Sequence, residues 1–374
     1  MKITLCTVTL GVLILFAAAC GDDTSTKGAG GGGSQGGGGA GGGLDCSDPA
    51  TTPAAPCGTL SFAESDVHSR KRNHHVTLLA ETAAGTFIYV VGGANGNSVL
   101  DETDRYAVHA DGSLEAGTAQ TPLPVALGGM TGQLVSNVVL IAGGTRGSQV
   151  SDAAYAAVIG ADGSLGAWAD VGSVAHPRMH PASVAKDDTI YVMGGFDDPD
   201  VWDDIVKATV SSDGAVSAWT SAGALPGKRS HFAATRVGDY VYLTGGLEES
   251  AFSNPPFLAT TWRGHFLSDG TIGEWAAGPD LPVQLATHAS FFYGGYLYVG
   301  GGISNPPAKQ EKRMFRAAIG DDHALGAWEE TTPLLVARGH VHQFPVYKNH
   351  VYSFAGALDF NLSSTDEIDI GTFE

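Results

Sequence analysis

The sequence has little positive charge. Only 20 of its 374 residues are Lys or Arg, against 39 Asp or Glu, and the formal net charge is −19. Binding to nucleic acid depends on clustered Lys and Arg side chains that contact phosphates. The composition therefore argues against a nucleic-acid partner and fits an exported, acidic domain.

Long hydrophobic runs are scarce as well, and the run at the N-terminus has the pattern of a signal peptide. Lys2 is followed by an apolar stretch over residues 3–16 and then by Ala17-Ala18-Ala19. A membrane-spanning helix needs about 20 apolar residues, which is more than this stretch provides. The pattern predicts a cleaved signal peptide over residues 1–19, and an uncleaved anchor is the alternative.

Cysteine is the third scarce residue, with four copies, and one of them follows the signal peptide directly. The segment Ala17-Ala18-Ala19-Cys20-Gly21 resembles the lipobox of bacterial lipoproteins, with Ala where an aliphatic residue is commoner. This resemblance implies that Cys20 carries the lipid. In that family an Asp after the lipidated Cys often retains the protein at the inner membrane. Because Gly21 stands there, the sequence favours the outer membrane of a bacterial cell envelope.

Residues 20–45 are predicted to be a tether, since 13 of the 25 residues after Cys20 are Gly and most of the others are Ser, Thr, Ala, Gln or Asp. Such a segment cannot bury enough apolar surface to offset the entropy of ordering its backbone. A chain of this kind and length has a root-mean-square reach of about 25–30 Å.

Two further cysteines, Cys46 and Cys57, flank a Pro- and Thr-containing loop at the start of the globular part. Disulfides persist in exported proteins, so we expect a bridge that closes this loop. Two free thiols are the alternative.

Internal repetition dominates the remainder of the chain. A glycine doublet, or its variant Ala-Gly, ends a short β-patterned run six times, with first positions 51, 51, 51, 56 and 54 residues apart. These first positions are Gly92, Gly143, Gly194, Gly245, Gly301 and Ala355. A second motif recurs once in each of four repeats, at a similar distance after the doublet. It has Asp-Gly or Asp-His, an aliphatic residue two positions later and a Trp three positions after that, at Trp168, Trp219, Trp275 and Trp328.

Asp-Gly between two β-patterned runs is typical of a hairpin turn, because Gly accepts a positive φ. Each repeat is therefore predicted to form four short strands. In the third repeat these are residues 180–185, 189–193, 205–210 and 216–220.

The doublets with their Tyr and Trp partners resemble the Kelch family, in which each repeat forms one blade of a propeller. The resemblance covers roughly residues 58–374 and implies an all-β fold, a six-bladed Kelch-type β-propeller over residues 46–374. Three positions depart from the pattern: Leu140 replaces Tyr, Gly117 replaces Trp and Ala355 replaces the first Gly.

The last repeat lacks a fourth strand, and the N-terminus has a spare one. Gly58-Thr59-Leu60 matches the start of the fourth strand in other repeats. Leu60 also lies 14 residues before His74, close to the offset of 15 elsewhere. The N-terminal strand is thus predicted to close the last blade, which would remove exposed sheet edges.

An Arg-x-His pattern recurs at the predicted start of the innermost strand, where i and i+2 should project to the same side. The pairs are Arg72 and His74, Arg178 and His180, Arg229 and His231, and Arg338 and His340. The second and fifth repeats offer Gly129 and His288 instead. One interpretation is a mouth that binds anions or sugars through Arg. The other is structural, with Arg and His bonded to backbone carbonyls between blades, as is common in Kelch-like repeats.

Two other groups of residues are candidate sites. His340 and His342 could place two imidazoles on one strand face, but no third ligand is evident, so no metal is predicted. Trp202 stands outside the repeat register among the carboxylates of residues 197–204. It could stack on a sugar, and the carboxylates could bind Ca²⁺; a solvated acidic loop is the alternative.

Two enzymes on Kelch propellers can be compared by residue. Galactose-oxidase-like copper enzymes need a Cys inside the propeller, and no Cys follows Cys57. Sialic-acid mutarotases are exported Kelch propellers that act on an anionic sugar, but no catalytic motif here matches them.

The prediction is a lipid-anchored, monomeric, non-catalytic binding or scaffolding protein without cofactor, whose partner is a protein or a glycan. The alternative is a carbohydrate-active or glycan-binding propeller, mutarotase-like, that uses the Arg-x-His mouth. Fold alone does not decide between the two.

Overall fold

The computed structural model describes residues 59–251 and 256–374, and its regular elements are β-strands. The predicted signal peptide, the tether and the cysteines Cys20, Cys46 and Cys57 lie outside the described residues. Within the described ranges, no helix has the length and apolar character that crossing a membrane requires.

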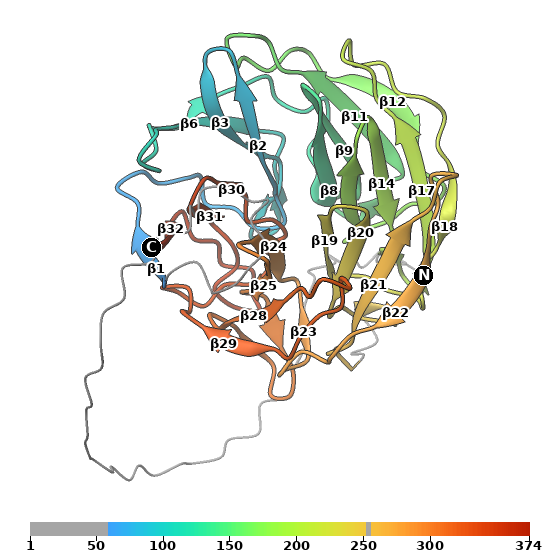
Figure 1. Cartoon of the computed structure of the whole chain (residues 1–374). Helices are drawn as coiled ribbons and strands as arrows, with labels where there is room; N and C mark the ends of the chain where they lie inside the picture. The colour runs from blue at the N-terminus through green and yellow to red at the C-terminus, as the bar shows by residue number, and fades with distance from the viewer. Residues whose placement is uncertain (1–58, 252–255) are drawn as a thin grey trace, which may run out of the picture.

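Six four-stranded units follow one another around a ring (Figure 1), and we call them blades 1 to 6. Blades 3 and 4 are joined into one eight-stranded sheet by a parallel pairing of Gly223 with Ile272. Blade 1 consists of β2 (Val76–Thr82), β3 (Gly85–Val91), β6 (Thr103–Val108) and β7 (Thr118–Ala119). Blade 2 consists of β8 (Gly128–Val135), β9 (Val138–Arg146), β11 (Ala153–Val158) and β12 (Ala169–Ser173). Blade 3 consists of β13 (Ala182–Lys186), β14 (Thr189–Met193), β17 (Asp204–Thr209) and β18 (Thr220–Ala224).

The other three blades repeat this antiparallel order. Blade 4 consists of β19 (Ala233–Val237), β20 (Tyr240–Thr244), β21 (Thr261–Phe266) and β22 (Ile272–Ala277). Blade 5 consists of β24 (Ala289–Tyr293), β25 (Tyr296–Gly300), β28 (Met314–Ala318) and β29 (Glu329–Thr331). Blade 6 consists of β30 (Val346–Tyr347), β31 (His350–Phe354), β32 (Ile368–Phe373) and β1 (Leu60–Glu64).

Two-residue strands extend the loops at one face of the ring. They are β4 (Ala94–Asn95), β5 (Ser98–Val99), β10 (Gln149–Val150), β15 (Phe196–Asp197), β16 (Asp200–Val201), β23 (Leu285–Ala286), β26 (Ile303–Ser304) and β27 (Lys309–Gln310).

The N-terminal strand closes the last blade, as the sequence predicts. Strand β1 pairs antiparallel with β32, from Leu60 opposite Phe373 to Glu64 opposite Asp369. The first described strand therefore lies beside the last strand of the chain (Figure 1). Leu60 and Phe373 are both buried in the core.

The predicted fourth strand of the third repeat is misplaced by four residues. The structure has β18 over Thr220–Ala224, whereas the prediction began at Val216. Val216 makes only an isolated bridge to Val210, because the Asp-Gly turn narrows to a tight loop before the strand proper. Regular pairing of β18 with β17 begins at Thr220, opposite Lys207, and a register shift follows within the strand between Ser221 and Ala224.

The glycine doublets join neighbouring blades through the backbone. The second glycine donates its N–H to a carbonyl of the next blade, as Gly144 does to Arg178 and Gly195 to Arg229, both at 2.8 Å. The first glycine has no room for a side chain: a Cβ on Gly194 would lie 2.3 Å from the Arg229 carbonyl oxygen. Both positions also have positive φ, which glycine adopts at no steric cost.

The tyrosine before the doublet makes a second connection to the following blade. Tyr89 Oη donates to the Gly163 carbonyl at 2.5 Å, and Tyr242 Oη donates to that of His323 at 2.7 Å. Each acceptor belongs to the turn before the next blade's Trp. The motif residues of one blade thus bond to residues of the next blade, and together they form the interface between blades.

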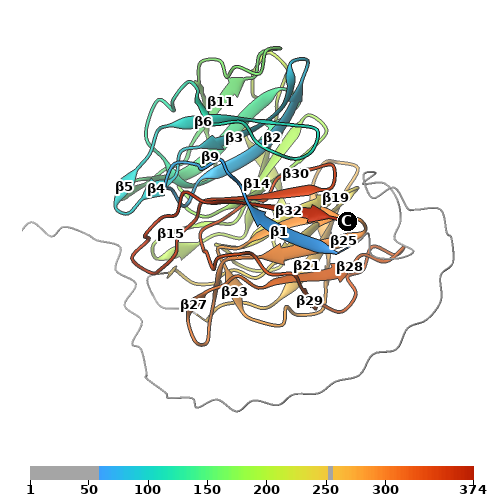
Figure 2. The same cartoon turned by 90° about the vertical axis from the view of Figure 1, so that its left-hand side faces the viewer.

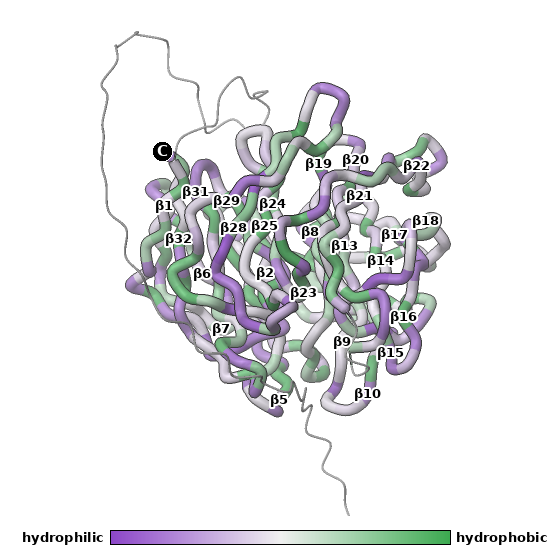
Figure 3. The backbone as a smooth tube through the Cα atoms, turned by 90° about the horizontal axis from the view of Figure 1, so that it is seen from below, coloured by the Kyte–Doolittle hydropathy of each residue, from purple (hydrophilic) through white to green (hydrophobic). Residues whose placement is uncertain are grey.

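The hydrophobic core lies between adjacent blades. One cluster joins residues of blades 2 and 3, and another joins blades 6 and 1 across the closure. The hydrophobic stretches in Figure 3 follow the strands, and hydrophilic stretches lie at the connecting loops. This distribution is that of sheets packed face to face around an axis.

Candidate functional site at the centre of the ring

Six equivalent residues form a closed backbone ring around the axis. They are His74, Gly129, His180, His231, Thr287 and His340, and their φ angles lie between 49° and 69°. Hydrogen bonds of 2.8–3.2 Å link these residues in order around the ring. The Gly129 N–H donates to the His74 carbonyl, and the ring closes where the His74 N–H donates to the His340 carbonyl. Between Thr287 and His340 the link uses the Thr287 hydroxyl and the Val341 N–H.

This ring corrects two predictions. Thr287, with a φ of 56°, holds the position in blade 5 that the sequence comparison gave to His288. The Arg and His side chains of each pair do not project to the same side, contrary to the prediction. The left-handed backbone conformation of the His turns the chain and ends the i, i+2 alternation. The regular inner strand starts only two residues after the His, as at Val76 in blade 1.

The arginines point into their own blades. Arg178 Nη1 donates to the Gly194 carbonyl at 2.9 Å, and the guanidinium also forms a bidentate pair with Asp204 at 3.0 and 2.8 Å. Arg72 donates a single bond to one carboxylate oxygen of Asp104, and Arg338 a single bond to one of Asp369 at 3.0 Å. These guanidinium groups are buried, so the geometry favours the structural interpretation. The carbonyls they bind belong to the same blade, whereas the sequence argument placed them between blades.

Arg229 differs because its blade offers no carboxylate at the equivalent position. It donates to the Gly245 carbonyl at 2.5 Å and to the Thr260 hydroxyl at 2.8 Å. Burial without a close anion lowers the pKa of Arg229 to about 10, with Glu248 opposing the shift from a distance.

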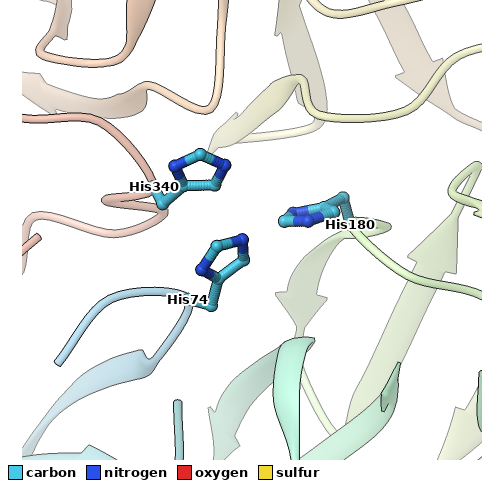
Figure 4. A group of neighbouring side chains, drawn as sticks. All are labelled: His74, His180 and His340. Atoms are coloured by element: carbon cyan, nitrogen blue, oxygen red, sulfur yellow. The ribbon is translucent and has the colours of Figure 1, made fainter. Parts of the chain in front are cut away.

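The four histidines of the ring point toward the axis and contact one another. His74 stacks on His340 with ring centroids 4.0 Å apart, and His180 stacks on His231 at 3.9 Å. Ligand nitrogens of His74, His180 and His340 all lie within 4.8 Å of one another. Figure 4 shows these three rings converging from three separate segments of the chain.

A hydrogen bond sets the tautomer of His74. Asn73 Nδ2 donates to the Leu362 carbonyl at 3.1 Å and to the Ser364 hydroxyl at 2.8 Å. The amide oxygen of Asn73 must then face His74 Nδ1, which it contacts closely. An oxygen acceptor requires a proton on Nδ1, so the Nε2 of His74 carries a free lone pair.

The cluster is neutral and short of hydrogen-bond partners. Burial lowers the pKa of His340 to about 3, and burial with the neighbouring histidines holds the pKa of His74 and His180 well below the usual range. Among the described residues, the Nδ1 atoms of His180 and His340 and the Nε2 of His342 are buried without a hydrogen-bond partner. Neutral imidazoles with free nitrogens are the usual ligand form for transition metals.

Trp202 lies apart from this cluster. Its ring stacks on His176 with centroids 4.2 Å apart, and its Nε1 donates to the Pro177 carbonyl at 3.1 Å. One face of the indole is therefore already covered.

The acidic partners of the arginines, Asp104, Asp204 and Asp369, were not predicted from the sequence. They follow their arginines by 32, 26 and 31 residues, so a fixed-spacing search does not detect them. Alignment on the third strand of each blade would have found them, because all three lie near or at its start.

No family model matches the chain. Among curated proteins, alpha-scruin of Limulus polyphemus is 26% identical over 204 residues, which cover 54% of this chain and 21% of that protein. Kelch-like protein terF of Aspergillus terreus is 28% identical over 181 residues, which cover 47% of this chain and 38% of that protein. Kelch repeat-containing protein At3g27220 of Arabidopsis thaliana is 26% identical over 184 residues, which cover 49% of this chain and 41% of that protein. This chain is a Kelch-repeat protein.

The Kelch assignment agrees with a structural comparison. The solved structure of YjhT superposes with a TM-score of 0.63 at 13% identity, over 81% of this chain and 95% of that one. At this identity the likeness shows the fold alone. The Kelch protein described here spans about a fifth of alpha-scruin and well under half of terF.

Proposed function

We propose that this Kelch propeller is a non-catalytic binding protein held at the bacterial cell envelope, in the outer membrane, by a lipid on Cys20. The Kelch fold supports a binding or scaffolding role in general terms. The signal peptide and lipobox pattern of residues 1–21 support the anchor. A single propeller, closed by its own N-terminal strand, suits a monomer.

The binding face is the one that carries the loops between second and third strands. Strands β4, β5, β15 and β27 belong to these loops and lie toward the same side of the ring (Figure 2). The opposite face holds tight two-residue hairpins and the turns before each Trp. Function on a repeat scaffold resides in its variable loops, because the scaffold holds them rigidly while their sequences differ. This grouping is the observation that carries the proposal.

The loops of blades 3 and 4 give this face an acidic patch. Asp198, Asp200, Glu248 and Glu249 are exposed there. The Ser250 hydroxyl donates to Asp198, which joins the two loops. Adjacent carboxylates attract a cationic surface, so the partner we propose is a protein with a basic patch.

A glycan partner is supported less well. The arginines that would bind an anionic sugar are buried and already bonded to carbonyls, carboxylates or a hydroxyl of their own blades. Trp202 has one ring face covered by His176. The Arg-x-His mouth therefore offers no free guanidinium to a sugar acid.

Site-specific cross-linking in the bacterial host tests the face. A photo-reactive amino acid at Asp200 is expected to trap a discrete protein adduct, while the same probe at Asp188 on the opposite face traps none. Adding Glu248→Lys should weaken the adduct because it reverses charge next to the probe, whereas Glu81→Lys on the opposite face serves as the matched control. Adducts at Asp188 alone, or insensitivity to Glu248→Lys, would contradict the proposal.

A further inference from the structure

The histidine side chains at the axis are not needed for the backbone ring that they occupy. Gly129 and Thr287 complete the same ring in blades 2 and 5 with φ angles of 69° and 56°. Four imidazoles are buried instead, and the Nδ1 atoms of His180 and His340 have no hydrogen-bond partner there, which is destabilising. Something other than chain geometry accounts for the cluster.

The arrangement of nitrogens fits a metal ion. Because the ligand nitrogens of His74, His180 and His340 all lie within 4.8 Å of one another, some point lies no more than about 2.8 Å from each. Zinc binds imidazole nitrogen at about 2.0–2.1 Å. The three rings would therefore have to close in by less than about 1 Å, which side-chain rotation can supply.

We propose that His74, His180 and His340 bind a divalent transition-metal ion of the zinc class on the axis of the ring. The sequence argument found no third ligand beside His340 and His342, because the ligands come from blades 1, 3 and 6 and are far apart along the chain. The closed ring brings them together (Figure 4).

The chemistry of the donors sets the class of metal. Three imidazoles suit Zn²⁺, Co²⁺, Ni²⁺ or Cu²⁺, whereas Ca²⁺ and Mg²⁺ require oxygen ligands that this cluster does not contain. The Asn73 amide fixes His74 with Nε2 free, which is the outer-sphere support that metal-binding histidines usually have. His342, whose ring centroid lies 5.2 Å from that of His180, can supply a fourth nitrogen.

Such an ion would act as a structural cross-link between three blades. A ligand that binds only the folded state raises stability in proportion to the logarithm of its concentration. The inference is independent of the proposed binding face and of the anchor.

The test uses the full protein in detergent, without a polyhistidine tag, stripped with EDTA and reloaded with ZnCl₂. We expect one equivalent of zinc by mass spectrometry, a melting temperature that rises with zinc concentration, and visible Co²⁺ absorption bands of a tetrahedral site. His180→Asn and His340→Gly should lower zinc affinity by at least about tenfold. His231→Asn is the matched control, because it changes a neighbouring ring residue outside the triad and should retain the zinc.

Two results would overturn the proposal. One is no stoichiometric zinc and no zinc-dependent melting shift in the wild type. The other is equal zinc binding by the triad variants and by His231→Asn, which would place the metal elsewhere. Circular dichroism of each metal-free variant separates loss of the site from loss of the fold, and His340→Gly repeats a residue that blade 2 already tolerates at this position.

Discussion

Each arginine of the Arg-x-His pattern connects two blades through two different groups. The carbonyl of Arg178 accepts from Gly144 of the preceding blade, while its guanidinium bonds Gly194 and Asp204 within its own blade. Charged groups buried in this way are costly to leave without partners.

We expect Arg178→Ala to lower the free energy of unfolding by about 1–3 kcal/mol for each partner left unsatisfied. Arg229→Ala should cost less, because it leaves neutral oxygens and removes a buried cation that has no close carboxylate. Urea denaturation followed by fluorescence measures both. The exposed Arg236→Ala is the control, and a loss of under about 1 kcal/mol in Arg178→Ala would contradict the structural role.

Stability should also fall with acid because of the buried histidines. His288 donates to or accepts from the Thr244 hydroxyl at 2.9 Å, and burial lowers its pKa to about 3, with His342 and Arg229 adding to the shift. An unfolded His binds a proton near pH 6.5, so the stability that neutral His288 provides is present above pH 6.5 and is lost as the pH falls toward 3.

Between pH 7 and pH 5 this one residue should account for a loss of about 2 kcal/mol. His288→Gln keeps a group at the Nε2 position and cannot take up the proton. Its free energy of unfolding, measured by urea titration at both pH values, should fall by that much less than the wild type. An unchanged pH dependence would show that folding does not lower the pKa of His288.

At the level of single residues, the sequence predicted those that recur at a constant spacing in the repeats. It did not predict those whose position depends on tertiary contacts or on a turn of the backbone. The Arg-x-His pairs were found, but Asp104 and Asp204 were not, because tertiary contacts select them and the loops before them differ in length. Left-handed His74 was likewise not foreseen, since alternation along a strand was assumed where the chain turns.

At the scale of elements, the sequence predicted the doublet strands and the closing strand well. The spacing between the fourth strand of one repeat and the His of the next is nearly constant. Leu60 could therefore be assigned to a fourth strand from its offset to His74. The fourth strand of blade 3 was less predictable, because the residues between the Asp-Gly turn and Thr220 are β-patterned in sequence but make only an isolated bridge at Val216.

The closing strand carries a prediction at this scale. Deleting residues 46–63 removes nearly all of β1 and leaves an edge of β32 unpaired, so we expect a lower melting temperature and aggregation. Deleting residues 46–57 keeps β1 and is the matched control. If the two truncated proteins melt together at the wild-type temperature, closure by β1 does not stabilise the ring.

At the scale of the whole molecule, the ring consists of a scaffold of six blades and of the loops on one face. Backbone bonds from the doublets and from the axial residues make the blades one scaffold, and the loops of one face are free to vary. If residues 20–45 form the tether that the sequence predicts, this scaffold would be able to act at a distance from the membrane.

The anchor gives the prediction for the whole chain. If Cys20 carries the lipid, Cys20→Ser should move the protein from the membrane fraction to the soluble fraction, since acyl chains provide membrane affinity of about 0.8 kcal/mol per buried CH₂. Cys57→Ser is the control and should stay with the membrane. Gly21→Asp should retain the lipid but shift the protein from outer to inner membrane in a density gradient, because it creates the retention signal. An uncleaved apolar anchor predicts membrane association for all three variants, so fractionation of Cys20→Ser separates the two readings of the N-terminus.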